Sequence, residues 1–251
     1  MGLMTGKRAL MEMLRAEGIK YIFGNPGTSE GPILDALEDF PDLKYLLTSQ
    51  EGAAMGMADG YARATGKPAF VNLHIETGLA NGLSLLHNAS EGGTPMVVTS
   101  ANKDIRKLAE GRSDLAQMVR PFAKWSVEVT DPAQIPSIMR RAFTEAKTPP
   151  TGPVYVGFSA NSLDGEANME IVPSAPGYFR TPPDKRAVED ASKLLIEAEH
   201  PVIVVGDRLA QSGGVAEAVH IAELTGSRVY ASSYSEMNFP TDHPHFMGRI
   251  G

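Results

Sequence analysis

The sequence predicts an α/β protein in which a parallel sheet, with helices on both faces, is followed by the beginning of a second, Rossmann-like α/β domain. Between residues 5 and 158, short apolar segments alternate with amphipathic or small-residue segments, as they do in parallel sheets with connecting helices. A proline-rich segment then interrupts this alternation, and the same pattern starts again beyond it.

The elements of the first domain follow from caps, turns and apolar periodicity. Thr5 can cap a helix that has an apolar stripe and ends at Gly18. The apolar run at 43–47 has the composition of a short buried strand. Strands are expected at 21–23, 43–47, 69–73, 95–99 and 154–158, and the later helices at 32–37, 52–64, 78–89 and 134–146.

The segment 172–183 is expected to link two domains. It contains four prolines, which continue neither a helix nor a sheet ladder. We therefore expect a first domain at 1–178 and a second at 179–251. Helices and strands of the second are expected to alternate at 184–197, 201–205, 213–224 and 228–231. Two strands are too few for a stable sheet, so this second part is expected to be an incomplete domain.

The composition excludes several classes of function. Of the 251 residues, 42% are hydrophobic and 21% are charged, which is usual for a soluble globular protein. The net charge of −7, without a dense run of Lys and Arg, argues against a nucleic-acid partner. The absence of cysteine excludes disulfides and thiolate chemistry. No segment has the apolar length of a membrane span or of a signal peptide, so we expect a cytoplasmic protein without a membrane partner.

Two residues occupy positions that suit proton transfer. Glu51 follows the apolar run 43–47 and opens a stretch of small residues, where a carboxylate would be partly desolvated and its pKa raised. His74 ends the strand at 69–73, and ligands collect at the carboxyl ends of parallel strands. For both residues the alternative is a purely structural role, hydrogen-bonded at the end of a strand.

No metal site and no phosphate-binding loop are predicted within the sequence. Asp242, His243 and His245 have side chains that ligate metals, but the intervening Pro244 favours an extended loop instead. The glycines do not have the spacing of a dinucleotide-binding or Walker-type loop.

Three segments resemble, in the same order, motifs of the thiamine diphosphate-dependent enzymes. They read FGNPGTSE at 23–30, TSQEGAAMGMADGYARATGKP at 48–68 and NLHIETGLAN at 72–81. The likeness is greatest to the benzoylformate decarboxylases, in the group that also contains acetolactate synthases and pyruvate decarboxylases. It implies a pyrimidine-binding domain with the thiamine diphosphate-binding fold at 1–178, and the beginning of a middle domain at 179–251.

The same resemblance implies a cofactor and an assembly. The cofactor would be thiamine diphosphate. The family's Gly-Asp-Gly motif and later Asn, which hold Mg²⁺ and the diphosphate, have no counterpart here, so the Mg²⁺ ligands are expected on a C-terminal domain outside this sequence. Enzymes of this kind are homodimers or homotetramers with the active site between subunits.

The resemblance also implies roles for the matched residues. Glu51 would hydrogen-bond the pyrimidine ring of the cofactor and activate it, and His74 would donate and accept protons around the substrate. Thr28 stands where benzoylformate decarboxylases have a serine that contacts the substrate carboxylate, and Ser29 could serve instead. For both hydroxyls the alternative is a helix N-cap.

Three further residues are expected beside the cofactor. Gly27 lies in the turn after the first strand, and Gly78 would allow close approach of the backbone. Asn81 could hydrogen-bond across the site.

The predicted function is therefore decarboxylation of a small-molecule 2-oxo acid by the N-terminal portion of a thiamine diphosphate-dependent lyase. An acetolactate synthase-like carboligase is one alternative, because the motif around Glu51 is common to both groups. A non-catalytic or truncated module, without the diphosphate-binding domain, is the other. The sequence does not identify the 2-oxo acid.

Overall fold

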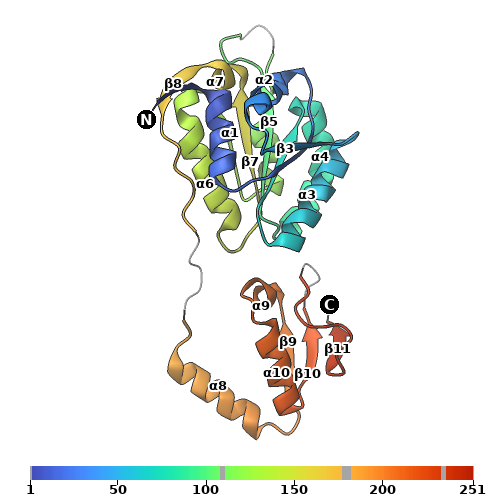
Figure 1. Ribbon diagram of the computed structural model, residues 1–251. Coiled ribbons are helices and arrows are strands. Elements are labelled where there is room, and N and C mark those ends of the chain that lie inside the picture. Colours follow the sequence, from blue (N-terminus) through green and yellow to red (C-terminus); the bar gives the residue numbers. More distant parts are fainter. Residues whose placement is uncertain (1, 108–110, 177–181, 233–235, 251) are drawn as a thin grey trace. The chain divides into compact units, whose positions relative to one another are not determined.

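The computed structural model describes residues 2–107, 111–176, 182–232 and 236–250 (Figure 1). The chain divides into two compact units, Met1–Gly177 and Tyr178–Gly251. In the described part of the chain, no helix is both long enough and apolar enough to cross a membrane.

The first unit is built on a six-stranded parallel sheet, as the alternating pattern predicts. Its strand order is β3-β2-β4-β5-β7-β6, and every neighbouring pair is parallel. The central strands β4, β5 and β7 are buried along their whole length, because helices cover both faces of the sheet. The strands are β2 Tyr21–Asn25, β3 Lys44–Leu47, β4 Ala69–Leu73, β5 Met96–Asn102, β6 Trp125–Val129 and β7 Pro153–Ser159.

Helices cover both faces of the sheet (Figure 1). Each layer encloses an apolar core against the sheet. On one face α1, α2 and α6 pack together with residues such as Leu10, Ile33 and Phe143, and on the other α3, α4 and α5 pack with residues such as Met55 and Leu86. The helices are α1 Gly6–Ala16, α2 Gly31–Ala36, α3 Glu51–Thr65, α4 Ile75–Glu91, α5 Leu115–Val119, α6 Ile135–Lys147 and α7 Ala160–Asp164.

The predicted cap of α1 is present in the structure. The hydroxyl of Thr5 accepts a hydrogen bond from the backbone N–H of Arg8, at 3.4 Å. The apolar stripe behind it, which includes Leu10 and Leu14, is completely buried. Sequence periodicity and the cap therefore place this helix correctly.

The edges of the sheet differ from the predictions. The strand predicted at 43–47 is present as β3, but it is an edge strand and Leu47 at its end is 71% exposed, so the prediction that this strand is buried is wrong. The opposite edge strand, β6, was not predicted. Neither was the two-stranded antiparallel sheet of β1 Gly2–Thr5 and β8 Glu166–Met169. Edge strands lack the continuous apolar pattern on which these predictions relied.

The second unit also alternates helices and strands. Its three-stranded parallel sheet has the order β11-β10-β9 and a small core around Val205, Ala222 and Phe239. Every residue of α8 is at least partly exposed. The elements are α8 Lys185–Glu197, β9 Val202–Val205, α9 Asp207–Gln211, α10 Val215–Thr225, β10 Arg228–Ala231 and β11 Phe246–Arg249.

Candidate active site

A group of polar side chains lies where strands of the first unit end. Asn25 ends β2, and Glu30 follows it in a 3₁₀ turn at Thr28–Glu30. Glu51 begins α3 shortly after β3, and His74 comes directly after β4. Because all the strands are parallel, their carboxyl ends meet at one edge of the sheet, which brings these side chains together.

Glu51 is held by two side-chain amides. Its Oε1 accepts a hydrogen bond from Asn25 Nδ2 at 2.9 Å, and its Oε2 accepts one from Asn81 Nδ2 at 3.0 Å. Burial raises the pKa of Glu51, but the hydrogen bonds from Asn81, from its own backbone and from Asn25, together with the charge of His74, hold that pKa below its usual value. The expected raised pKa is therefore wrong, because amide donors stabilise the ionised form.

Two glycines allow other groups to approach this site closely. A Cβ atom on Gly78 would lie 3.0 Å from Glu51 Oε1 and 3.2 Å from His74 Cβ. A Cβ atom on Gly27 would lie 2.2 Å from His74 Nδ1. The absence of a side chain at both positions therefore lets the backbone pass against the two polar residues, as was expected for Gly78.

His74 is paired with a second buried carboxylate that was not predicted as a site residue. Glu30 is completely buried, and its Oε2 lies 2.7 Å from His74 Nδ1. The same Oε2 accepts the backbone N–H of Gly27 at 2.9 Å. Oε1 accepts the N–H of Ala101 at 3.0 Å and that of Ile75 at 3.3 Å. The Glu30 carboxylate therefore joins the ends of β2, β4 and β5.

The chain enters α4 directly from β4, through a strained residue. Ile75 has a φ angle of +30°, which β-branched residues avoid. Strain of this kind costs about 1–3 kcal/mol and is concentrated at functional sites. The prediction placed the start of this helix at Gly78, but the helix begins three residues earlier, at Ile75. His74 occupies its N-cap position.

Thr28 and Ser29 belong to the 3₁₀ turn that ends at Glu30. Helix α2 begins after Glu30 and has no side-chain cap, so neither hydroxyl is the helix cap that was the alternative interpretation. Thr28 is exposed and Ser29 is partly exposed. Thr28 directly follows Gly27, the residue that packs against the His74 ring.

The predicted residues Glu51, His74, Gly78 and Asn81 are thus brought together by direct contacts, and Gly27 adjoins the same histidine. Asn25 and Glu30 were missed, although both lie in the segment 23–30. The signal that could have indicated Glu30 is its spacing of three residues from Gly27, which is the spacing of a capping-box glutamate.

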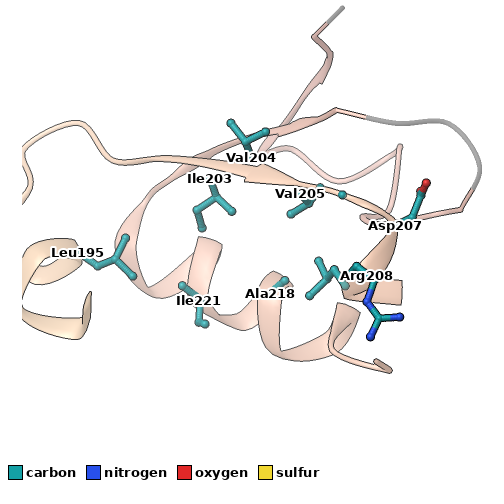
Figure 2. A pocket seen from close by; sticks show the side chains of 10 residues that line it. Leu195, Ile203, Val204, Val205, Asp207, Arg208, Ala218 and Ile221 are labelled. Carbon is teal, nitrogen blue, oxygen red and sulfur yellow. The ribbon is translucent and has the colours of Figure 1, made fainter. Parts of the chain in front are cut away.

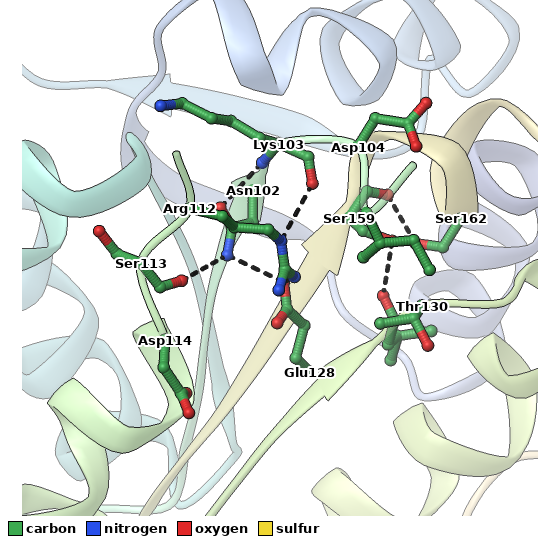
Figure 3. Close-up of polar contacts among 12 residues, drawn as sticks. Asn102, Lys103, Asp104, Arg112, Ser113, Asp114, Glu128, Thr130, Ser159 and Ser162 are labelled. Atoms are coloured by element: carbon green, nitrogen blue, oxygen red, sulfur yellow. Dashed lines mark hydrogen bonds and ion pairs between the residues drawn. The ribbon is translucent and has the colours of Figure 1, made fainter. Parts of the chain in front are cut away.

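A second polar cluster lies at the ends of β5 and β6 (Figure 3). Asn102 Nδ2 donates to Glu128 Oε1 at 2.9 Å and to the Ser113 carbonyl at 3.0 Å. Arg112 forms an ion pair with Glu128 and donates through Nε to the Lys103 carbonyl at 3.3 Å. These contacts tie the residues that follow β5 to the sheet.

A largely apolar pocket lies in the second unit (Figure 2). Its volume is about 410 Å³, and α8, β9 and α10 contribute apolar lining residues such as Leu195, Ile203 and Ile221. In the described part of the chain, no group of three or more metal-ligating side chains could hold a metal ion. His243 instead contacts Glu223, and His245 contacts the Ser227 carbonyl.

Two family models match the sequence. The model of the thiamine pyrophosphate enzyme N-terminal TPP binding domain matches residues 4–121. The model of the thiamine pyrophosphate enzyme central domain matches residues 188–251.

Individual relatives agree with these matches. A benzoylformate decarboxylase from Pseudomonas aeruginosa is 34% identical, over 97% of this chain and 47% of its own. A probable acetolactate synthase large subunit from Methanocaldococcus jannaschii is 33% identical, over 99% of this chain and 43% of its own. The chain thus spans about half the length of the curated relatives it matches.

Solved structures show the same relation. The thiamine diphosphate-dependent 4-hydroxybenzoylformate decarboxylase of Rhodococcus jostii matches with a TM-score of 0.86 and 31% identity, over 98% of this chain and 48% of that one. The benzoylformate decarboxylase of Polynucleobacter necessarius matches with a TM-score of 0.86 and 28% identity, over 98% of this chain and 47% of that one.

Proposed function

The chain belongs to the thiamine pyrophosphate enzyme family, and from this premise we propose that it forms the N-terminal part of a thiamine diphosphate-dependent 2-oxo acid decarboxylase. Residues 1–178 would be the pyrimidine-binding domain, and residues 179–251 would begin the central domain. The division of the chain into the units Met1–Gly177 and Tyr178–Gly251 supports this assignment.

The observation that carries the proposal is the environment of Glu51. The residue is 7% exposed, and each of its carboxylate oxygens accepts a hydrogen bond from one side-chain amide. An ionised carboxylate has about four acceptor positions, so capacity remains for a ring N–H of a ligand. Gly78 leaves room beside Oε1 for such an approach. These residues fit the pyrimidine end of thiamine diphosphate.

Bound thiamine diphosphate would supply the electron sink that decarboxylation of a 2-oxo acid requires. Glu51 would hold a proton at the pyrimidine ring, and Asn25 and Asn81 would keep its carboxylate in place. His74, with a side chain that is 30% exposed, would exchange protons with the substrate. Thr28 or Ser29 would donate a hydroxyl to the substrate carboxylate.

Several parts of this proposal lie outside the chain. The Mg²⁺ ion and the diphosphate would be held by a C-terminal domain, and the complete site would form between subunits of a homodimer or homotetramer. The shares of about half that the chain covers in its relatives support a further domain in the whole protein. The proposed location is the cytoplasm.

Activity of the full-length protein on benzoylformate and on pyruvate tests the proposal. We expect carbon dioxide and an aldehyde from a 2-oxo acid, with dependence on thiamine diphosphate and Mg²⁺. His74→Ala should reduce turnover by about 10²-fold or more, because a positioned acid–base group contributes that much. Thr28→Ala and Ser29→Ala should raise KM for the 2-oxo acid at whichever position contacts its carboxylate. Wild-type turnover in the His74 variant would contradict its role.

Carboligation is the second candidate function. The 33% identity to a probable acetolactate synthase large subunit favours it specifically. The same assay with pyruvate separates the two, because a carboligase would yield acetolactate in place of free acetaldehyde. If neither product forms with any 2-oxo acid, although thiamine diphosphate binds, the chain belongs to a non-catalytic module.

A further inference from the structure

Glu30 is a buried carboxylate with no task in the function proposed above. It is 0% exposed and has four hydrogen-bonding partners. Three of them are backbone N–H groups, at Gly27, Ile75 and Ala101, and the fourth is His74 Nδ1. One of these partners, Ala101, is 71 positions away from Glu30 in the sequence. Burial alone does not explain why a carboxylate has so many partners.

The three backbone partners match an ionised carboxylate, which only accepts hydrogen bonds. Backbone N–H groups are always donors, and an ionised carboxylate is only an acceptor, so all three contacts are satisfied when Glu30 is ionised. The remaining contact, between Oε2 and His74 Nδ1 at 2.7 Å, then needs a hydrogen on the nitrogen. In a neutral imidazole, Nε2 is consequently the nitrogen with the free lone pair.

The Gly27 backbone also lies close to the His74 ring. The Gly27 backbone is so close that a Cβ there would be 2.2 Å from Nδ1 and 2.3 Å from Cε1. The strained residue Ile75, which directly follows His74, is held through its backbone N–H by Glu30 Oε1. One carboxylate therefore secures both the ring and the backbone that carries it.

We propose that Glu30 is a positioning residue, which fixes His74 in the tautomer with hydrogen on Nδ1 and leaves Nε2 as the nitrogen that exchanges protons with the substrate. The part concerning the substrate rests on the proposed function of His74. The tautomer itself is a property of the chain alone and needs neither cofactor nor substrate.

Glu30→Gln should reverse the tautomer. The carboxamide can place its oxygen toward Ala101 and Ile75, with its NH₂ toward Gly27 and His74, which creates one donor–donor conflict. The opposite orientation creates two. The preferred orientation makes the amide a donor to His74 Nδ1, so the ring hydrogen must move to Nε2. A reversed tautomer of this kind disables the histidine of the Ser-His-Asp triad.

The test is ¹⁵N NMR of the imidazoles in the 251-residue chain, at a pH where the rings are neutral, with His74 assigned by comparison with His74→Asn. We expect protonated Nδ1 in the wild type and protonated Nε2 in Glu30→Gln. Glu76→Gln is the matched control, because it removes a carboxylate two residues from His74 that has no hydrogen bond to that ring among the described contacts. It should leave the tautomer unchanged.

Protonated Nε2 in the wild-type spectrum would overturn the inference, and this measurement does not depend on the folding of Glu30→Gln. An unchanged tautomer in a folded Glu30→Gln chain would overturn it as well. In the full-length protein, Glu30→Gln should lower kcat by about 10²-fold, the size of an acid–base contribution. Absence of any decarboxylase activity together with the expected tautomers would support the positioning inference and overturn the proposed function instead.

Discussion

Glu30 and Glu51 are both buried carboxylates at the carboxyl edge of the same parallel sheet, yet different donors hold them. Three backbone N–H groups and a histidine surround Glu30. Two asparagine side chains, Asn25 and Asn81, hold Glu51. Backbone donors cannot turn away, whereas side-chain amides can exchange one partner for another. The fold therefore fixes the donors of Glu30, whereas the donors of Glu51 can rearrange.

The largest expected effect concerns activity at Glu51. Glu51→Gln in the full-length protein should lower kcat by about 10²–10⁴-fold, because an amide cannot take up or release the ring proton. The fold should remain, since glutamine keeps the size of the side chain. Steady-state kinetics with saturating thiamine diphosphate would show this, and circular dichroism would check the fold. Turnover close to that of the wild type would contradict the proposed role.

The second effect concerns stability. Glu30→Ala should lower the free energy of unfolding more than Glu51→Ala does. Glu30→Ala leaves three N–H groups without an acceptor, and those of Ile75 and Ala101 are buried. At about 1–3 kcal/mol for each buried group, the free energy of unfolding should fall by about 2 kcal/mol or more. Glu51→Ala should cost only about 1 kcal/mol, because Asn25 and Asn81 can turn toward water. Urea unfolding of both variants measures the difference. Equal losses would remove the distinction between the two carboxylates.

A smaller effect is expected from two glycines that differ in the space around them. Gly78→Ala places a methyl group 3.0 Å from Glu51 Oε1 and should destabilise the chain by about 1–3 kcal/mol. Gly60→Ala, in the middle of α3, meets nothing within 4 Å and should stabilise it by about 0.5–1 kcal/mol. Thermal unfolding would compare the two variants. If both variants change the stability in the same direction, the close approach of Gly78 in α4 to Glu51 is contradicted.

The smallest effect is a pH dependence. The folded state lowers the pKa of Glu51, so its ionised form contributes stability above the usual value of 4.5, and this contribution disappears as the pH falls through the folded value. The wild type should therefore lose more stability on acidification than Glu51→Gln. Urea unfolding of both at neutral pH and at about pH 3, below the usual carboxyl range, measures this. If the difference in free energy of unfolding between the wild type and Glu51→Gln is the same at both pH values, the pKa of Glu51 is not lowered by folding.

The sequence predicted Glu51, but it did not predict Glu30. Glu51 lies in a long motif at a strand end, and the resemblance carries Gly78 and Asn81 with it. The partners of Glu30 are up to 71 residues away, and hydrogen bonds to distant backbone leave no periodic pattern. The lowered pKa of Glu51 was missed for the same reason, because its donors Asn25 and Asn81 are remote in sequence.

The fold shows a similar division between what the sequence predicted and what it did not. The central strands β4, β5 and β7 are continuous apolar runs, and burial on both faces explains why they were identified. Edge strand β6 contains Glu128 and is only partly buried, so it lacks that pattern. Strands β1 and β8 lie at opposite ends of the first unit in the sequence, and they pair Gly2 with Met169. The local sequence of neither strand indicates the other.

The three backbone contacts of Glu30 also bear on how this protein folds. They join Glu30 to residues 3, 45 and 71 positions away in the sequence. All three can therefore form only after β2, β4 and β5 have paired in the sheet. The amide hydrogens of Ile75 and Ala101 should therefore become protected from exchange with solvent together, and late in refolding. In the native protein they should exchange only when this part of the sheet opens. The proton-transfer site would then report on the completion of the fold itself.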